Sequence, residues 1–146
     1  MNTRDFLLFG NQIQRLYAQE CREICGQFAL NRVELDVLAF LANNAPYDTA
    51  KDIVQLRGIA KSNVSTAVER LTERQMLVTQ VDSEDRRRVH LILTGAASPA
   101  VRRMQEMQAR LFECLLEGVS EEDCKTMERV HQTMQRNIRR AMKDDL

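Results

Sequence analysis

The chain has 146 residues, with 21 lysines and arginines balanced by 21 aspartates and glutamates, so its formal net charge at pH 7 is zero. This balance excludes a nucleic-acid binder that relies on bulk positive charge, and the length suits one domain or two small ones. Hydrophobic residues make up 44% of the chain and aromatic residues only 5%, with seven methionines. This composition predicts an ordered core and favours helix over sheet.

The sequence also predicts a cytoplasmic protein without a membrane span. No apolar run approaches the roughly 20 residues that cross a bilayer, and the start, Met1-Asn2-Thr3-Arg4-Asp5, lacks the basic opening of a signal peptide. Four cysteines are few for a disulfide-stapled domain, and a chain of this length can bury a core without them. We therefore expect reduced thiols.

Two helices are predicted first. About residues 4–28 form a long amphipathic helix, in which apolar residues recur at three- and four-residue spacing: Phe6, Phe9, Ile13, Leu16, Tyr17, Ile24 and Phe28. Asn31 followed by Glu34 is an N-cap pattern, so a second helix begins there. This helix is expected to end near Asn43-Asn44, before a proline.

The third and fourth predicted helices form a helix-turn-helix. The third is short, starts at a cap provided by Asp48 or Thr49, and ends at Gly58, which suits a left-handed C-terminal turn. After a few residues, Ser62 is expected to cap the fourth helix. Its apolar face consists of Val64, Ala67, Val68 and Leu71. Two short helices joined by a tight turn with glycine predict this motif.

The hydrophobic period then changes. Residues 77–81 and 88–93 are rich in β-forming side chains and are separated by the polar segment 82–87. These runs predict a β-hairpin with a charged tip.

Two more helices complete the chain. A fifth is capped by Thr94 or Ser98 and ends at Gly118, and a sixth opens at Ser120 with Asp123 and continues almost to the C-terminus. The fold class is thus mainly α with a small hairpin (α+β), in a single domain spanning residues 1–146. The apolar stripes of the terminal helices would be exposed unless they pack on each other or on a second copy. We therefore expect a homodimer.

Four segments follow one another along the chain: Ser62 to Leu71, Leu77-Val78, Asp82 to Arg87 and Leu91-Ile92-Leu93-Thr94. Together they resemble the recognition helix and wing of MarR-family winged helix-turn-helix repressors. The most specific part is Asp85-x-Arg87 followed by a strand that ends in Leu-Thr. The order of six helices with one hairpin after the fourth extends the resemblance over the whole chain.

The resemblance implies a bacterial, sequence-specific transcriptional regulator, usually a repressor, that binds a pseudo-palindromic double-stranded DNA operator as a homodimer. It implies a winged helix-turn-helix lobe at about residues 32–95, with dimerisation helices at about 4–30 and 98–146. It also implies release by a small phenolic or otherwise aromatic effector bound between these two parts. It implies no cofactor.

The chain departs from the family pattern at two places. Members usually have glycine at the end of the recognition helix, where this chain has Gln75, and a basic residue on the first wing strand, where it has Thr79 and Gln80. A residue other than glycine in the left-handed conformation costs about 1 kcal/mol. Without a basic side chain at Thr79 or Gln80, the first wing strand lacks a contact to DNA phosphate that this residue would make in relatives.

The polar face of the fourth helix provides the candidate base-reading residues. Hydroxyl and amide groups there can meet base edges or phosphates, and arginine can reach guanine in a major groove. The residues are Ser62, Asn63, Ser65, Thr66 and Arg70. Supporting phosphate contacts are assigned to Arg57, Lys61 and Arg74. The alternative is an ordinary amphipathic surface helix.

The hairpin tip has three consecutive arginines, Arg86, Arg87 and Arg88. By the resemblance, Arg87 enters the minor groove, where a narrow groove concentrates negative potential. Asp85 is expected to orient the arginines, because phosphates repel its carboxylate. The alternative is a solvated turn with local ion pairs.

The sequence gives less support to functions other than DNA binding. Cys21 and Cys25 share a helix face, which allows a redox- or metal-responsive regulator as a secondary hypothesis. The preferred interpretation is that both are small hydrophobic residues on or near the apolar stripe. No metal-ligand spacing and no catalytic motif occurs, so we expect neither a metal site nor an enzyme. A winged-helix module that binds protein instead of DNA remains a further alternative.

Overall fold

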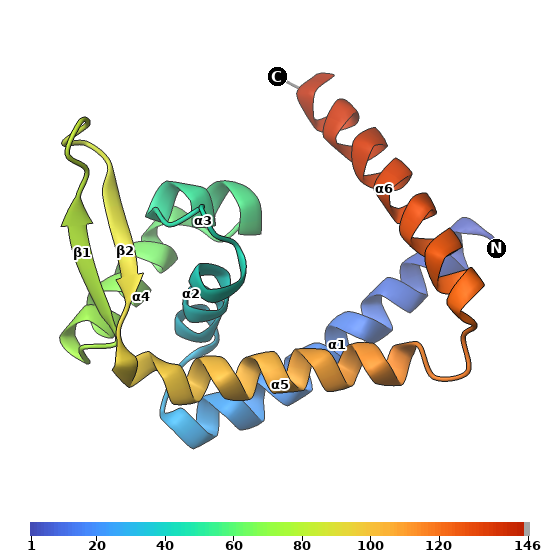
Figure 1. Cartoon of the computed structure of the whole chain (residues 1–146), viewed down its shortest axis with the longest axis horizontal. Coiled ribbons are helices and arrows are strands. Elements are labelled where there is room, and N and C mark those ends of the chain that lie inside the picture. Colours follow the sequence, from blue (N-terminus) through green and yellow to red (C-terminus); the bar gives the residue numbers. More distant parts are fainter. Residues whose placement is uncertain (145–146) are drawn as a thin grey trace. The chain divides into compact units, whose positions relative to one another are not determined.

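The computed structural model describes residues 1–144 and divides the chain into two units, Met1–Ala109 and Arg110–Leu146. In chain order the elements are α1 (Thr3–Phe28), α2 (Arg32–Asn43), α3 (Ala50–Arg57), α4 (Lys61–Glu73), β1 (Leu77–Val81), β2 (Val89–Leu93), the 3-10 turn η1 (Gly95–Ala97), α5 (Ser98–Leu115) and α6 (Glu121–Asp144) (Figure 1). Within the described residues, six α-helices and one antiparallel hairpin confirm the predicted fold class.

Local capping sets several helix ends where the sequence predicts them. The Asn31 side chain accepts a hydrogen bond from the Glu34 amide at 2.8 Å and starts α2. Thr49 and Asp52 form a reciprocal capping box at the start of α3, which settles the choice between Asp48 and Thr49. Gly58 ends α3 with φ of +66°. These contacts span three or four residues, so the local sequence is enough to specify them.

The predicted cap of α4 is wrong. The helix begins at Lys61, its N-cap is Ala60, and no side chain caps it. The carbonyl of Ala60 already accepts the amide of Val64 at 3.1 Å, so the helix starts as soon as the short turn after Gly58 is complete. Ser62 therefore lies inside the first turn of the helix with its side chain exposed.

Three other boundaries differ by a few residues. Strand β2 begins at Val89, because the Arg88 amide bonds to the Asp85 carbonyl within the hairpin turn. Thr94 precedes the 3-10 turn that leads directly into α5 at Ser98. Helix α5 ends at Leu115, before the left-handed Gly118.

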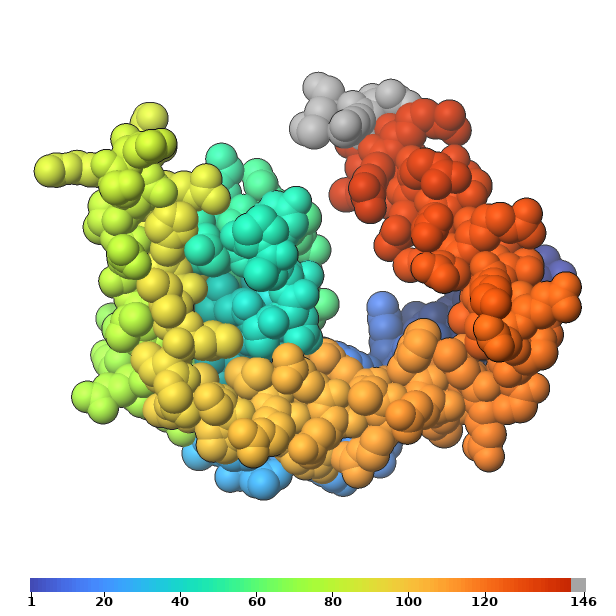
Figure 2. Space-filling model, viewed as in Figure 1, coloured from blue at the N-terminus to red at the C-terminus, as the bar shows by residue number. Residues whose placement is uncertain are grey.

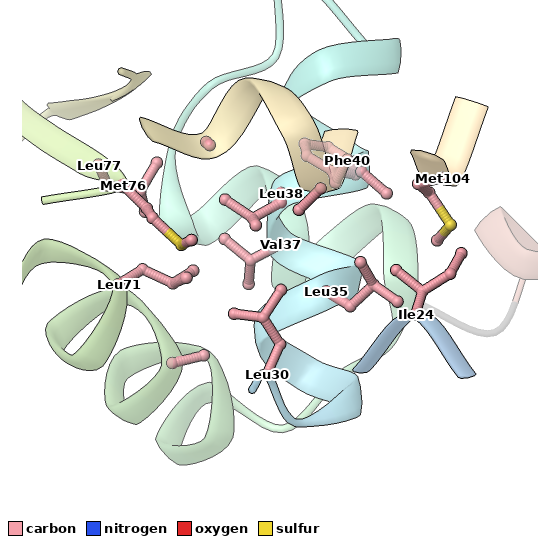
Figure 3. Close-up of a cluster of buried hydrophobic side chains, with 14 of the residues drawn as sticks. Ile24, Leu30, Leu35, Val37, Leu38, Phe40, Leu71, Met76, Leu77 and Met104 are labelled. Carbon is pink, nitrogen blue, oxygen red and sulfur yellow. The ribbon is translucent and has the colours of Figure 1, made fainter. Parts of the chain in front are cut away.

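Helix α2 lies at the centre of the core of the first unit (Figure 3). Buried side chains from α1, α4, the hairpin and α5 belong to the same cluster as those of α2: Ile24, Leu35, Val37, Leu38, Phe40, Leu71, Leu77 and Met104, among others. Figure 1 shows the C-terminal part of α1 and the N-terminal part of α5 running beneath α2. The core thus joins α4 and the hairpin to α1 and to the N-terminal part of α5.

A polar network joins α1, α2 and α5 beside this core. The Gln108 amide donates to the Tyr17 hydroxyl at 2.9 Å and accepts a hydrogen bond from the Asn43 amide at 3.0 Å. The Arg32 guanidinium stands 5.2 Å from the centre of the Tyr17 ring, a cation–π contact. These contacts lie at the edge of the core, where Tyr17 and Gln108 are half-buried and Asn43 is exposed, and they link the three helices side by side.

The hairpin is packed on one face only. Its register pairs Leu77 with Leu93 and Thr79 with Leu91, and the Leu77 and Leu91 side chains are buried. Its outer positions, including Val78 and Ile92, are exposed. The Leu91 amide also donates to the Asp48 carbonyl at 2.8 Å, so β2 is joined to the loop that precedes α3.

Both terminal helices carry exposed apolar side chains. On α1, Phe6 and Phe9 are 40% and 52% exposed. On α6, Met127, Val130, Met134 and Ile138 lie along one stripe, and Ile138 is 58% exposed. Among the residues that the structure describes, no helix is long and apolar enough to cross a membrane.

Candidate nucleic-acid interface

Helix α4 presents the polar face that the sequence predicts. Val64, Ala67 and Leu71 are buried against the core and Val68 is half-buried beside them, so the polar residues of the helix lie on its solvent side. The exposed set comprises Ser62, Asn63, Ser65, Thr66 and Arg70. The Thr66 hydroxyl donates to the Ser62 carbonyl at 3.0 Å and keeps its acceptor sites for another partner. The helix surface thus offers hydroxyl, amide and guanidinium groups in the combination that base edges and phosphates accept.

The two arginines at the C-terminal end of α4 have partners within the protein. Arg70 faces the Glu34 carboxylate at 3.7 Å, and its side chain is 58% exposed. The Arg74 guanidinium donates to the carbonyls of Ala29 and Phe28 at 2.7 and 2.8 Å, and lies 3.8 Å from Glu34. Arg74 therefore satisfies the free carbonyls at the C-terminal end of α1. We assign Arg74 this structural role and leave it out of the proposed phosphate contacts.

Arg57 and Lys61 lie on either side of the turn between α3 and α4. The Arg57 guanidinium is 3.3 Å from the Asp36 carboxylate, which also accepts a hydrogen bond from Arg32 at 3.0 Å. Lys61 is the first residue of α4 and is exposed. Phosphate contacts by Arg57 and Lys61 stay predictions.

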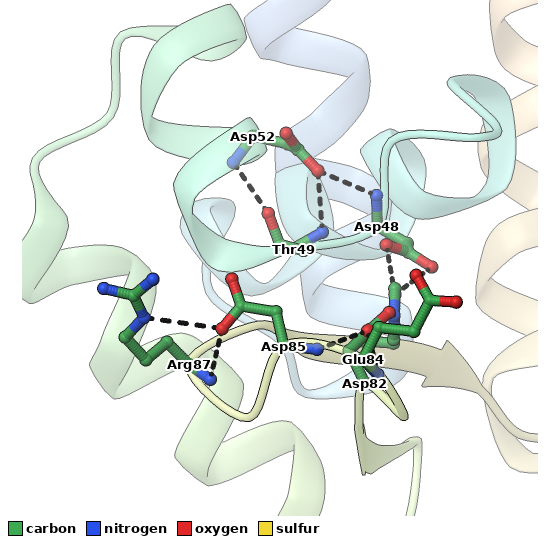
Figure 4. Close-up of polar contacts among 8 residues, drawn as sticks. Asp48, Thr49, Asp52, Asp82, Glu84, Asp85 and Arg87 are labelled. Atoms are coloured by element: carbon green, nitrogen blue, oxygen red, sulfur yellow. Dashed lines mark hydrogen bonds and ion pairs between the residues drawn. The ribbon is translucent and has the colours of Figure 1, made fainter.

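The hairpin tip is ordered by two aspartates (Figure 4). One oxygen of Asp82 accepts hydrogen bonds from the amides of Glu84 and Asp85, both at 2.9 Å. Asp85 accepts the Arg87 amide at 3.0 Å and lies 3.4 Å from its Nε. The Arg87 side chain is nevertheless 93% exposed. Asp85 thus orients Arg87, as the sequence predicts, and the Arg87 guanidinium stays accessible to a partner.

All three tip arginines face solvent. Arg86, Arg87 and Arg88 are exposed, and the tip of the hairpin stands clear of the neighbouring helices in the space-filling view (Figure 2, yellow-green). A groove of about 820 Å³ separates the hairpin from the first turn of α3. Lys51, Arg87 and Arg88 line it, together with the acidic residues Asp52 and Asp85. Lys51 is a basic residue that the sequence analysis did not select.

Sequence reasoning also missed the contacts of His90. Its Nδ1 lies 2.8 and 2.9 Å from the two carboxylate oxygens of Asp48, and its Nε2 lies 2.7 Å from an oxygen of Asp82. The bonds to Asp82 and Asp48 raise the pKa of His90, and the same bond with His90 lowers the pKa of Asp82. The contact with Asp48 spans 42 residues, so no local pattern could reveal it.

The two cysteines of α1 differ in exposure. Cys21 is fully buried in the core and Cys25 is partly buried. Burial raises the pKa of both thiols, against a smaller opposing effect of the Arg32 charge. A raised pKa lowers the fraction of thiolate, the reactive and metal-binding form. Among residues 1–144, no group of three or more His, Cys, Asp or Glu side chains is arranged to hold a metal ion.

The comparison with family models gives a match to the MarR family over residues 30–88. This segment contains α2, the helix-turn-helix, β1 and the hairpin tip, and it ends just before β2. The match confirms the resemblance that the sequence of the recognition helix and wing predicts.

Solved structures extend the likeness over nearly the whole chain. A MarR-family transcriptional regulator from Silicibacter pomeroyi has a TM-score of 0.76 at 18% identity, covering 93% of this chain and 90% of that one. The MepR–DNA complex of S. aureus gives 0.70 at 21% identity, with coverages of 94% and 99%. A structure of MarR gives 0.73 at 16% identity, with coverages of 100% and 96%. The fold is therefore that of MarR-family winged-helix regulators.

Proposed function

We propose that this chain, which has the MarR-family fold and matches the family model over its helix-turn-helix, is a sequence-specific DNA-binding transcriptional regulator. Helix α4 inserts its polar face into a major groove, and the hairpin, which is the wing of this fold, places Arg87 in the adjacent minor groove. The observation that carries the proposal is the exposed polar face of α4 beside an ordered, arginine-tipped wing.

The distribution of charge supports this assignment. Residues 57–90 contain seven basic and five acidic side chains, whereas residues 1–56 contain five and seven. The positive excess therefore coincides with the helix-turn-helix and wing. It is small, so affinity for arbitrary DNA should be low, and recognition depends on where the basic groups lie.

The proposed assembly is a homodimer that acts as a repressor. Exposed apolar stripes on α1 and α6 each need a partner surface to be removed from water. A twofold dimer presents two α4 helices to successive major grooves, so the operator is a pseudo-palindrome with half-site centres about 34–36 Å apart.

A small phenolic or other aromatic effector is part of the proposal. It releases the operator by binding more tightly to the dimer geometry in which the two α4 helices miss the groove spacing. A panel of phenols and benzoates, added to the preformed complex, tests this step through a concentration-dependent loss of DNA binding. If no member of the panel changes the affinity, this class of effector is wrong.

The primary test is fluorescence anisotropy with duplex DNA from upstream of the protein's own gene, titrated with salt. We expect tight binding to one palindromic segment, weak binding to a scrambled duplex of equal length, and a linear fall of log affinity with log salt concentration. Failure to bind any such duplex at low salt would favour a winged-helix module that binds protein.

A further inference from the structure

The His90 imidazole connects two parts of the first unit that the chain separates widely. One ring nitrogen contacts Asp48, in the loop immediately before α3, and the other contacts Asp82, the residue that follows β1 (Figure 4 shows both carboxylates). His90 itself belongs to β2, whose next residue, Leu91, donates its amide to the Asp48 carbonyl. One side chain thus joins both strands of the wing to the start of α3.

These contacts require a particular protonation state. A neutral imidazole has one N–H donor and one lone pair, whereas an imidazolium has two N–H donors. With carboxylate oxygens within 2.9 Å of both nitrogens, a neutral ring would direct its lone pair at one carboxylate. Only the imidazolium donates to both, so the arrangement is complete only when His90 is charged.

The neighbouring charged groups belong to the same assembly. Asp52 on α3 accepts the amides of Asp48 and Thr49, so the loop that carries the Asp48 carboxylate is itself fixed. Asp82 uses one oxygen for His90 and the other for the two amides of the wing tip. Arg88 lies two residues before His90 and lines the groove toward α3. Loss of the His90–Asp82 bond therefore affects the residue that organises the turn before Arg87.

We propose that His90 is the positioning residue of the wing: in its protonated form it holds the hairpin against the loop before α3 and so fixes the approach of Arg87 to DNA, which makes operator affinity depend on pH. This inference rests on the proposed function, because it concerns the wing's part in DNA binding. The raised pKa of His90, caused by its bonds to Asp82 and Asp48, agrees with it. A group whose pKa is raised on folding contributes fully at low pH, and its contribution is lost as pH rises through the folded-state pKa.

The first experiment measures operator affinity by anisotropy from pH 6 to pH 9 at constant ionic strength. Wild-type affinity should fall by about tenfold across this range, the magnitude of losing one charge-assisted hydrogen bond. His90→Gln should bind weakly at pH 6 and show little further change. His131→Gln removes the other of the two histidines, which lies on α6 beside the apolar positions Met127 and Met134. Its absolute affinity is therefore not the readout, but its affinity should change with pH along the wild-type slope. Parallel profiles for wild type and His90→Gln would overturn the proposal.

A second variant separates positioning from simple attraction between a charged histidine and DNA. In Asp82→Asn, the retained oxygen still accepts the Glu84 and Asp85 amides, and the new amide donates to the lone pair of a neutral His90. Both contacts then survive deprotonation, so the affinity should no longer fall with pH. Glu84→Gln removes the same charge from the exposed tip and should keep the wild-type slope. A wild-type slope in Asp82→Asn would overturn the positioning role.

The third measurement needs no DNA. Proton NMR should give a His90 titration midpoint above the ordinary value of about 6.5, and trypsin should cut at the wing arginines faster in His90→Gln than in His131→Gln. A low midpoint or equal cleavage rates would reject the inference even if the operator binds. If these two results are as expected but no duplex binds, the proposed function fails instead.

Discussion

The arginines of the helix-turn-helix and wing have two different roles, which are distinguished by their partners. Arg74 donates to two main-chain carbonyls and faces a buried carboxylate, whereas Arg87 is 93% exposed and pairs with its neighbour Asp85. Residue type and position in the sequence do not separate these cases. The structure therefore predicts opposite consequences for two chemically identical truncations.

Truncation of the exposed arginine should affect DNA binding and leave stability unchanged. Arg87→Ala removes the cation of the proposed minor-groove contact, so we expect operator binding to weaken by about 5- to 150-fold, the equivalent of about 1–3 kcal/mol for a specific arginine contact, and the salt slope to become smaller. Anisotropy titrations at several salt concentrations measure both effects. Lys125→Ala, an exposed cation of α6, is the charge-matched control. Unchanged binding by Arg87→Ala would remove the wing from the mechanism.

Truncation of Arg74 should instead lower the free energy of unfolding. Arg74→Ala leaves the carbonyls at the end of α1 without their donor and the 5% exposed Glu34 with one counterion fewer. We expect a loss of about 2 kcal/mol, the range for hydrogen bonds to charged groups. Urea unfolding measures it, and Arg86→Ala at the exposed wing tip is the control. Equal unfolding midpoints for the two variants would contradict the structural role.

At the scale of elements, the position of the wing depends on its contacts with the rest of the first unit. A two-stranded hairpin has little stability by itself in water, and only one face of this one is packed. The Leu91 amide and the His90 ring attach it to the loop before α3. The connection between α4 and β1 is the other determinant, and there Gln75 has φ of +59°.

The end of α4 can be stabilised by a single substitution. Gln75 occupies the left-handed conformation that glycine adopts without strain, and its side chain is exposed. Gln75→Gly should therefore raise the free energy of unfolding by up to about 1 kcal/mol. Thermal or urea unfolding measures the gain, and Gln75→Ala, which keeps a Cβ, should give none. A gain in both variants would show that strain at this position is not the cause.

At the scale of the whole molecule, the exposed apolar stripes of α1 and α6 are the features that the proposed dimer must cover. Phe9 is 52% exposed on α1, and Ile138 is 58% exposed on α6. Burial of apolar surface contributes about 25 cal/mol per Å², so two such helices supply a strong drive for association.

A charge in the α6 stripe should dissociate that dimer. Ile138→Glu places a carboxylate among apolar side chains, where it would lose its hydration on association. We expect sedimentation to show a shift from dimer to monomer, together with weaker operator binding. Gln132→Glu adds the same charge on the opposite side of α6 and should leave the dimer intact. A wild-type sedimentation coefficient for Ile138→Glu would show that this stripe does not form the interface.

The sequence by itself determined the order of the elements, most of their ends and the polar face of α4. These features depend on hydrophobic period and on caps such as Asn31 with Glu34, which act over three or four residues. The formal net charge of zero likewise predicted that any recognition of DNA depends on where the basic side chains lie and not on their number.

Only the tertiary structure decided which polar groups are free for a partner. Arg74 meets carbonyls 45 and 46 residues away, and His90 meets Asp48 across 42 residues. The start of α4 at Lys61 likewise does not depend on the Ser62 side chain, because Ala60 is the N-cap and no side chain caps the helix. Such contacts form because the packing of α1, α2 and the hairpin brings distant segments together, and a local pattern carries no information about which segments will meet.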